Sequence, residues 1–249
     1  MCTVSFIPFS NGGYSLTSNR DEYLRRKSAL LPAIKKVHGH TILAPIDGHA
    51  KGTWIFASTK GISVCLLNGA FEPYDPAQVF RKSRGVILLE ILKYSSVDKF
   101  INDIDLKGIA PFTLIIIQDR KKTQKLYEFI WDGESKYVRY PSAEKPQIWS
   151  SCTLYDVSIR KKRELFFDDW IQREYFGKNR PITDFHLLDS RDNAAIPIIL
   201  KSEIHGTVSM TSLTYEKARI RIDYYDLIND KTYSKSINKP ALLDTAAAI

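Results

Sequence analysis

MCTVSFIPFSNGGYSLTSNRDE, residues 1–22, predicts the β-hairpin from which the fold is built. Residues 3–7 are rich in β-branched and aromatic side chains, and Asn11-Gly12-Gly13 is a strong turn signal. Residues 14–18 alternate in polarity as the returning strand does. An antiparallel pair places the start of one strand beside the end of the next, so we expect Cys2 to lie near residues 19–22, just past the second strand.

Beyond the hairpin, the hydrophobic pattern predicts alternating groups of strands and helices. Strands are expected at residues 53–58, 62–67, 112–118, 124–131, 136–140, 147–151, 207–215 and 218–225. Helices are expected at residues 76–94, 96–104, 158–175 and 182–188, the third burying Ile159, Leu165, Phe166, Trp170 and Ile171. This order is typical of an α+β layered domain. With no repeat or linker, we predict a single domain over residues 1–243 and a loose tail over 244–249.

The composition is that of a globular protein in a reducing compartment. Apolar residues make up 44% of the 249 residues, enough to bury a core without disulfides or metals. The three cysteines, Cys2, Cys65 and Cys152, are too sparse for a disulfide framework, which favours the cytoplasm. The longest apolar runs, such as residues 112–117, are too short for a bilayer, so no stable membrane insertion is expected.

The net charge of +8 comes from short basic clusters, such as residues 120–122 and 160–163. A basic excess can attract nucleic acid, an acidic membrane surface or anionic small molecules. No aromatic residues interleave with the clusters as in a nucleic-acid-binding motif, so we predict solvated faces and no nucleic-acid partner.

Cys2 is the first candidate for chemistry. Once Met1 is removed, the residue carries both a thiol nucleophile and an α-amine that can serve as its base. The reference pKa of an α-amine is about 8, so an appreciable fraction is neutral at pH 7. A cysteine at position 2 is by itself weak evidence, because a residue there is usually incidental.

The tetrad Asn19-Arg20-Asp21-Glu22 and Asn68 supply candidate partners for Cys2. A cation such as Arg20 lowers the pKa of a nearby thiol, and Asp21 could hold the ammonium group or orient Arg20. The amide of Asn68 could face an oxyanion. The simpler interpretations are a surface ion pair at a turn and, for Asn68-Gly69, an ordinary turn dipeptide.

Four segments in order resemble the NRDE family (Transport and Golgi Organisation 2-like): MCTVSFIP (1–8), SNRDE (18–22), GTW (52–54) and LLN (66–68). The four segments in this order are far more diagnostic than any one of them. The resemblance is weaker in the rest of the chain. The resemblance implies an N-terminal-nucleophile hydrolase-like fold, a four-layer αββα sandwich of two antiparallel sheets flanked by helices.

The resemblance also implies roles for single residues. Related amidases, such as bile-salt hydrolases and penicillin V acylases, use an N-terminal cysteine, an arginine, an aspartate and an asparagine donor. By that pattern Cys2 is the nucleophile, Arg20 and Asp21 support it, and Asn68 donates to the oxyanion. The implied reaction is attack on a small, non-peptide amide substrate followed by hydrolysis of a thioester, with no cofactor required.

The sequence departs from the amidase pattern at two later positions. Those enzymes use a second asparagine and a further arginine. Here residues 149–153 read WSSCT, with serine where asparagine is expected. Residues 206–211 contain no arginine, and the next arginine in the chain is Arg219. These departures leave open a non-enzymatic protein on the same fold that binds or traffics haem or another small ligand, and also a housekeeping protein with a degenerate site.

The remaining candidates have simpler structural explanations. His38-Gly39-His40 has the spacing of a metal site but lacks a third ligand, so a loop without metal is expected. His49, His186 and His205 are isolated and are predicted to be structural, and Cys65 is predicted to lie in the core. Trp54 and Trp131 are expected in the core or in a pocket wall.

Overall fold

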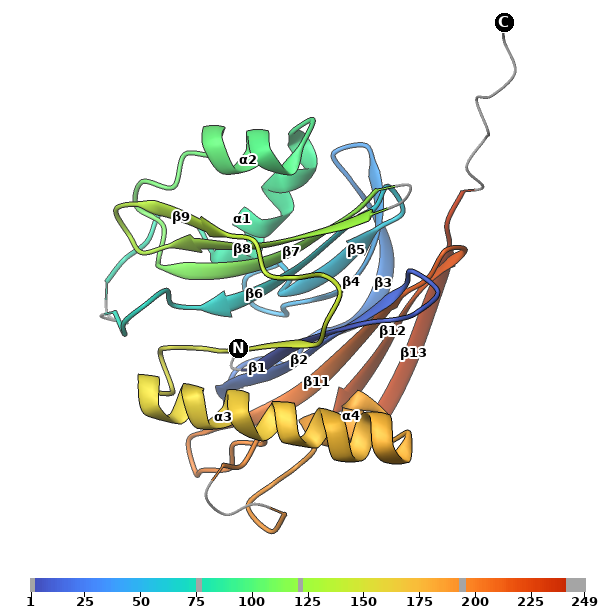
Figure 1. Ribbon diagram of the computed structural model, residues 1–249. Helices are drawn as coiled ribbons and strands as arrows, with labels where there is room; N and C mark the ends of the chain where they lie inside the picture. The colour runs from blue at the N-terminus through green and yellow to red at the C-terminus, as the bar shows by residue number, and fades with distance from the viewer. Residues whose placement is uncertain (1–2, 75–77, 121–122, 193–195, 241–249) are drawn as a thin grey trace, which may run out of the picture.

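Two antiparallel sheets face each other in the computed structural model, which describes residues 3–74, 78–120, 123–192 and 196–240 (Figure 1). Helices α1 (Arg84–Glu90) and α2 (Val97–Asp103) cover the outer face of one sheet. Helices α3 (Val157–Trp170) and α4 (Ile182–His186) cover the outer face of the other. The predicted αββα sandwich is therefore confirmed, whereas Cys2 and the tail of residues 244–249 lie outside the described residues.

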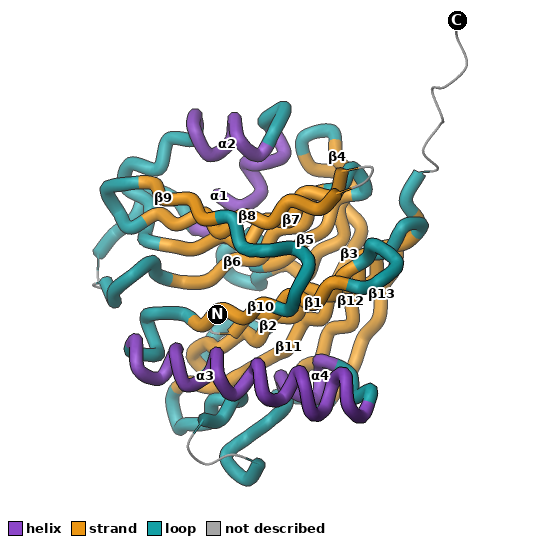
Figure 2. The backbone as a smooth tube through the Cα atoms, viewed as in Figure 1, coloured by secondary structure: helices purple, strands orange, loops and turns teal. Residues whose placement is uncertain are grey.

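Each sheet has a simple antiparallel order (Figure 2). The first sheet consists, from edge to edge, of β10 (Gln147–Ser150), β1 (Thr3–Pro8), β2 (Tyr14–Tyr23), β11 (His205–Tyr215), β12 (Arg219–Asp226) and β13 (Lys231–Asn238). The second consists of β3 (Leu30–Val37), β4 (His40–Ile46), β5 (Ile55–Ser58), β6 (Ile62–Asn68), β7 (Phe112–Arg120), β8 (Thr123–Trp131) and β9 (Lys136–Arg139). The hairpin that opens the chain thus lies inside the first sheet, flanked on both sides.

The alternation of side chains along β1 produces two separate cores. Val4 and Phe6 belong to a buried cluster that joins both sheets and the helices α1 and α2. Ile7, on the opposite face, packs with Phe167 and Phe185 beneath α3 and α4. Because successive strand residues point to opposite faces, every residue of this hairpin is committed either to the space between the sheets or to the helical layer.

The hairpin forms as predicted, but its second strand is longer than expected. Thr3 pairs with Asn19, and the turn is closed by a bond from the Phe9 amide to the Gly13 carbonyl. β2 continues to Tyr23, so the tetrad Asn19–Glu22 lies within the strand instead of just past it. The physical reason is the pairing with β11, which extends to His205 opposite Tyr23 and supplies hydrogen-bond partners for the extra residues.

Three strands and one helix boundary were not predicted correctly. β3 and β13 are edge strands with mostly exposed, lysine-rich sequences, and β4 follows β3 across the turn at His38-Gly39, so none shows a clear strand pattern. α1 begins at Arg84, not near residue 76, and Val79, placed on its apolar face by the pattern, is 93% exposed. The helix α2 and its Ser96 cap form as expected.

The packed face of the charged helix α3 agrees only in part with the prediction. It continues through a wider turn, Ile171–Phe176, so its length agrees with the expected 158–175. Trp170 and Ile171 are buried as predicted, but Leu165 is 64% exposed and Ile159 is also exposed. Phe167 and Arg163 occupy the buried face instead. Arg163 is the more informative exception, because a buried cation needs specific partners.

None of the helices in the described part of the chain is long and apolar enough to cross a membrane.

Candidate active site

The tetrad Asn19-Arg20-Asp21-Glu22 is divided between the two faces of the first sheet. Arg20 reaches between the sheets, where its guanidinium lies 4.9 Å from the ring centre of Trp54. Asn19 reaches the helical layer, where its amide nitrogen donates to the carbonyl of His186 (2.9 Å). Strand alternation places Glu22 with Arg20 and Asp21 with Asn19. The motif therefore serves two different environments, which explains why its four residues differ in chemistry.

Arg20 is held by Asp47, a residue that the sequence did not single out. Nη2 of Arg20 donates to Oδ2 of Asp47 at 2.7 Å, and Glu22 lies 3.9 Å away. Arg26 also contacts Asp47 (3.3 Å) and Glu22 (3.4 Å). The short ion pair of Arg20 is thus with Asp47, in the loop after β4, a partner that the sequence analysis did not consider beside Asp21.

Asp47 is an ionised carboxylate at neutral pH. Burial alone would raise its pKa, but the backbone N–H of Ala50 and the guanidinium groups of Arg26 and Arg20 outweigh burial and lower the pKa to about 2. Its Oδ1 accepts from the amides of His49 (2.9 Å) and Ala50 (2.7 Å). The loop after β4 therefore presents a fixed negative charge to Arg20.

A small pocket of about 100 Å³ lies between the sheets at this point. Its lining includes Arg20 and Asn68, two of the residues predicted for the site, together with Glu22, Arg26, Asp47, Ala50, Gly52, Thr53, Trp54, Leu66, Ser83, Arg84 and Gly85. Asn68 ends β6, and its half-buried side chain is available to the pocket. Trp54 forms part of the wall, and its buried indole Nε1 has no hydrogen-bond acceptor among the described residues.

Arg84 is another residue of this pocket that sequence reasoning missed. It is the first residue of α1, and its Nη1 donates to the Tyr74 hydroxyl (2.6 Å) and to the carbonyl of Pro111 (3.0 Å). A signal was present in the GTW segment: a Cβ atom on Gly52 would clash with the backbone carbonyl of Gly85. Glycine at both positions lets the start of α1 approach β5 closely enough to place Arg84 at the pocket.

Asp21 and Asn19 anchor the back of the strand. The Thr207 hydroxyl donates to Oδ1 of Asp21 (2.5 Å), which joins β2 to β11. His186 bridges Oδ1 of Asn19 (3.0 Å) and the hydroxyl of Ser5 (2.7 Å). Because the Asn19 oxygen only accepts, His186 Nδ1 carries the proton and Nε2 accepts from Ser5. Burial, reinforced by Arg163, lowers the pKa of His186 to about 3, so this histidine is neutral and structural, as predicted.

The start of β1 is fixed by Arg163 of α3. Nη1 of this buried arginine donates to the Thr3 hydroxyl at 2.7 Å, and its Nη2 donates to the Tyr155 hydroxyl (3.0 Å) and to the carbonyl of Pro197. Its guanidinium also lies 3.8 Å from the ring centre of Tyr155. Thr3 is the first described residue of the chain and follows Cys2 in the sequence. Cys2 itself is outside the described residues.

The two departures from the amidase pattern have structural counterparts. Ser151, one of the two serines in the segment where asparagine was expected, donates to the backbone carbonyl of Asn68 (2.6 Å) and therefore supports Asn68. β11 contains no arginine. Arg219 begins β12, next to Ile220, which pairs with Tyr215 at the far end of β11. Arg20 pairs with Ser209, nearer the start of β11, so Arg219 is distant from it along the sheet. The other two pocket arginines are Arg26, which follows β2, and Arg84 of α1.

The two other cysteines are poor nucleophiles. Cys65 is fully buried in β6, as predicted, and burial raises its pKa to about 12. Cys152 is also buried, which raises its pKa, and its thiol contacts the carbonyl of Glu72 (3.3 Å). Both thiols are therefore protonated at neutral pH.

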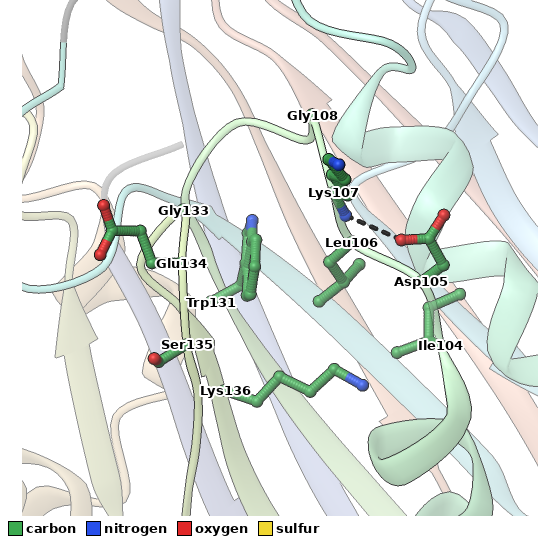
Figure 3. Close-up of a pocket in the computed structure, with 10 residues that line it drawn as sticks. All are labelled: Ile104, Asp105, Leu106, Lys107, Gly108, Trp131, Gly133, Glu134, Ser135 and Lys136. Carbon is green, nitrogen blue, oxygen red and sulfur yellow. Dashed lines mark hydrogen bonds between the residues drawn. The ribbon is translucent and has the colours of Figure 1, made fainter.

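A larger and more open hollow lies away from these residues, between the loop after α2 and the β8–β9 turn (Figure 3). Trp131 forms one wall, but its indole N–H already donates to the carbonyl of Ile109 (2.9 Å). Lys136 donates to the carbonyls of Ile101 and Asn102, both at 2.8 Å. Trp131 and Lys136 thus hold the loop after α2 and the end of α2 against the hairpin, and we do not assign chemistry to this hollow.

The histidine motif His38-Gly39-His40 forms the turn between β3 and β4. Nδ1 of His40 contacts the Ser58 hydroxyl (3.1 Å). Within the ranges that the structure covers, no three His, Cys, Asp or Glu residues gather in a way that could hold a metal ion.

Solved structures with the same architecture come from N-terminal-nucleophile hydrolases. Two are variants of conjugated bile acid hydrolase from Clostridium perfringens, and one of these carries alanine in place of its cysteine at position 2. They match with TM-scores of 0.59 and 0.53 at 12% and 13% identity, covering 95% and 96% of this chain and 96% and 98% of theirs. The N-acylethanolamine-hydrolyzing acid amidase orthologue of Caenorhabditis elegans matches with a TM-score of 0.56 at 12% identity, covering 85% of this chain and 92% of that one.

The architecture is thus that of the N-terminal-nucleophile hydrolase-like proteins, shown at the level of the fold. A search of curated proteins found no match to this sequence. The family model described as Transport and Golgi organisation 2 matches residues 1–180. The chain belongs to this family, which confirms the resemblance seen in its N-terminal segments.

Proposed function

We propose that the protein hydrolyses a small, non-peptide amide with Cys2 as the nucleophile. The observation that carries the proposal is the position of the pocket: Arg20 and Asn68 meet there, and Arg20 is next in the chain to Asn19, the partner of Thr3. Because Cys2 is bonded to Thr3, the proposal assigns its thiol to the end of β1 that pairs beside Arg20. The solved amidases of the same fold support this choice of reaction class.

The proposed reaction proceeds in two steps. After removal of Met1, the α-amine of Cys2 takes the proton of its thiol, and the thiolate attacks the amide carbonyl. The tetrahedral intermediate collapses by breaking the C–N bond, and the proton passes from the α-ammonium to the leaving amine. Water then attacks the resulting thioester, releases the carboxylic acid and returns the proton to the thiol.

Each predicted residue has a role that fits its surroundings. The guanidinium of Arg20 favours the thiolate of Cys2, and Asp47 keeps that guanidinium in place. The side-chain amide of Asn68 donates to the oxyanion, and Ser151 fixes the backbone of Asn68 from behind. Asp21, bound to Thr207, keeps the register between β2 and β11 beside the reaction centre.

The first test is the chemical state of the N-terminus. Intact mass should show a protein that lacks Met1, and limited iodoacetamide should label Cys2 before Cys65 or Cys152, whose buried thiols are protonated. Peptide mapping identifies the labelled residue. A retained Met1 in the purified protein would exclude the mechanism, because a peptide-bonded nitrogen cannot act as the base.

The second test separates catalysis from binding. Hydrolysis of a panel of short N-acyl amides should be lost in Cys2→Ala and retained in Cys65→Ala, a matched control at a buried thiol. A thioester trapped at Cys2 in the first turnover, seen by mass spectrometry, would support the acyl-enzyme step. Equal activity of Cys2→Ala and the wild type would refute it.

The alternative of haem binding finds no support in this pocket. A drug-sized ligand needs a mostly apolar cavity of about 300–1,000 Å³. The described pocket has about 100 Å³ and is lined by five charged side chains, Arg20, Glu22, Arg26, Asp47 and Arg84. These residues do not fit a haem slot. A haem titration followed by absorbance tests the alternative, and a saturable Soret shift would revive it.

A further inference from the structure

The charges that line the pocket between the sheets do not balance. Three guanidinium groups, Arg20, Arg26 and Arg84, face two carboxylates, Glu22 and Asp47. Arg20 and Arg26 each contact both carboxylates, at 2.7–3.9 Å. The negative charge of the pocket is therefore already shared between two of the three cations.

Arg84 is the cation left over. Its hydrogen bonds go to neutral oxygens, the Tyr74 hydroxyl and the Pro111 carbonyl, and its guanidinium lies 5.3 Å from the ring centre of Tyr74. No carboxylate of the described residues lies within 4.0 Å of it. Burial lowers the pKa of Arg84, and the more distant Glu22 offsets part of this effect.

The size and charge of the pocket define what could supply that anion. A half-buried cation such as Arg84 gains from a partner that both neutralises it and accepts its hydrogen bonds, and a carboxylate matches the planar fork of a guanidinium. The excess of one positive charge suits a singly charged carboxylate better than a dianionic phosphate. The free space of about 100 Å³ also admits only a small group.

We propose that Arg84 binds a carboxylate of the substrate, so that the substrate class is small amides that bear a carboxylate group. The amide part of this assignment rests on the proposed function, whereas the carboxylate part rests on the charge of the pocket alone. Arg84 would then determine specificity from α1, opposite the strand end that leads to Cys2. Arg20 and Arg26 keep their protein carboxylates and hold the pocket together.

The experiment measures binding in the absence of turnover. Cys2→Ala protein is titrated calorimetrically with N-butanoylglycine and with N-butanoylglycinamide, which has nearly the same shape but no charge. We expect the carboxylate probe to bind at least tenfold more tightly. Adding Arg84→Gln should abolish the difference, and Arg84→Lys should retain part of it. Arg81→Gln is the matched control, because Arg81 pairs with Asp105 outside the pocket.

The outcomes separate this inference from the proposed function. Equal affinity of the two probes for the Cys2→Ala protein would overturn the inference. A competition experiment gives a second test: if inorganic phosphate displaces N-butanoylglycine at a lower concentration than acetate does, the inference is also overturned. Selective binding without hydrolysis by the wild type would leave the inference standing and refute the amidase. If Arg84→Gln fails to fold, as shown by its thermal unfolding, the comparison of the two probes on the Cys2→Ala protein still decides.

Discussion

Replacing Asp47 by asparagine should remove the charge that holds Arg20 in the candidate active site. The pKa of Asp47 is lowered from 3.8 to about 2 in the folded protein. At about 1.4 kcal/mol for each pH unit, this difference corresponds to about 2 kcal/mol of stability at pH 7. The introduced asparagine can still accept from the Ala50 amide, but it turns an N–H₂ group toward the guanidinium of Arg20. We therefore expect Asp47→Asn to lower the free energy of unfolding by at least about 2 kcal/mol.

The pH dependence of this loss identifies its cause. A carboxylate with a lowered pKa stabilises the protein fully above its unfolded pKa, and the stabilisation is lost as the pH falls toward the folded pKa. Urea unfolding at pH 7 and pH 3 should therefore show the gap between wild type and Asp47→Asn shrinking by about 1 kcal/mol. Asp98→Asn is the control, since its ion pair with Lys125 is exposed and its loss should cost under about 0.5 kcal/mol. A gap that does not change with pH would refute the electrostatic explanation.

Three further predictions concern the elements that position the site. The pKa of His186 is lowered to about 3, so between pH 6.5 and that value only the unfolded state takes up the proton. The free energy of unfolding of the wild type should therefore fall by about 1.4 kcal/mol for each pH unit below 6.5. Urea unfolding of His186→Gln from pH 7 to pH 5 should lack this slope. Arg163→Leu removes the donor to Thr3 and should lower the stability by about 2–4 kcal/mol, whereas Thr3→Val should cost about 1 kcal/mol, both measured by urea unfolding at pH 7. Gly52→Ala forces α1 away from β5 and should destabilise by about 1–3 kcal/mol, while Gly39→Ala, with open space around it, should show only the smaller cost of its positive φ; thermal unfolding that ranks Gly39→Ala as the worse variant would contradict the close packing at Gly52.

Much of the architecture could be predicted because it depends on local pattern. Tyr14 and Leu16 alternate with polar residues along β2, and Gly12 supplies the positive φ of the turn, so the hairpin follows from neighbouring residues alone. Two of the three strands that were missed, β3 and β13, lie at sheet edges and are mostly exposed, so the pattern that marks burial is absent from them.

By itself, the sequence indicated the sandwich fold through its family resemblance, the hairpin of β1 and β2 through its pattern, and Arg20 and Asn68 as candidate residues, which line one pocket. Only the tertiary structure decided which charges meet there. Asp47 is 27 residues from Arg20, Arg163 is 160 residues from Thr3, and Arg84 reaches the pocket on a helix that starts later than predicted. A strand pattern specifies which face a side chain occupies, but ion pairing across facing sheets depends on how the layers pack, and no local signal encodes that.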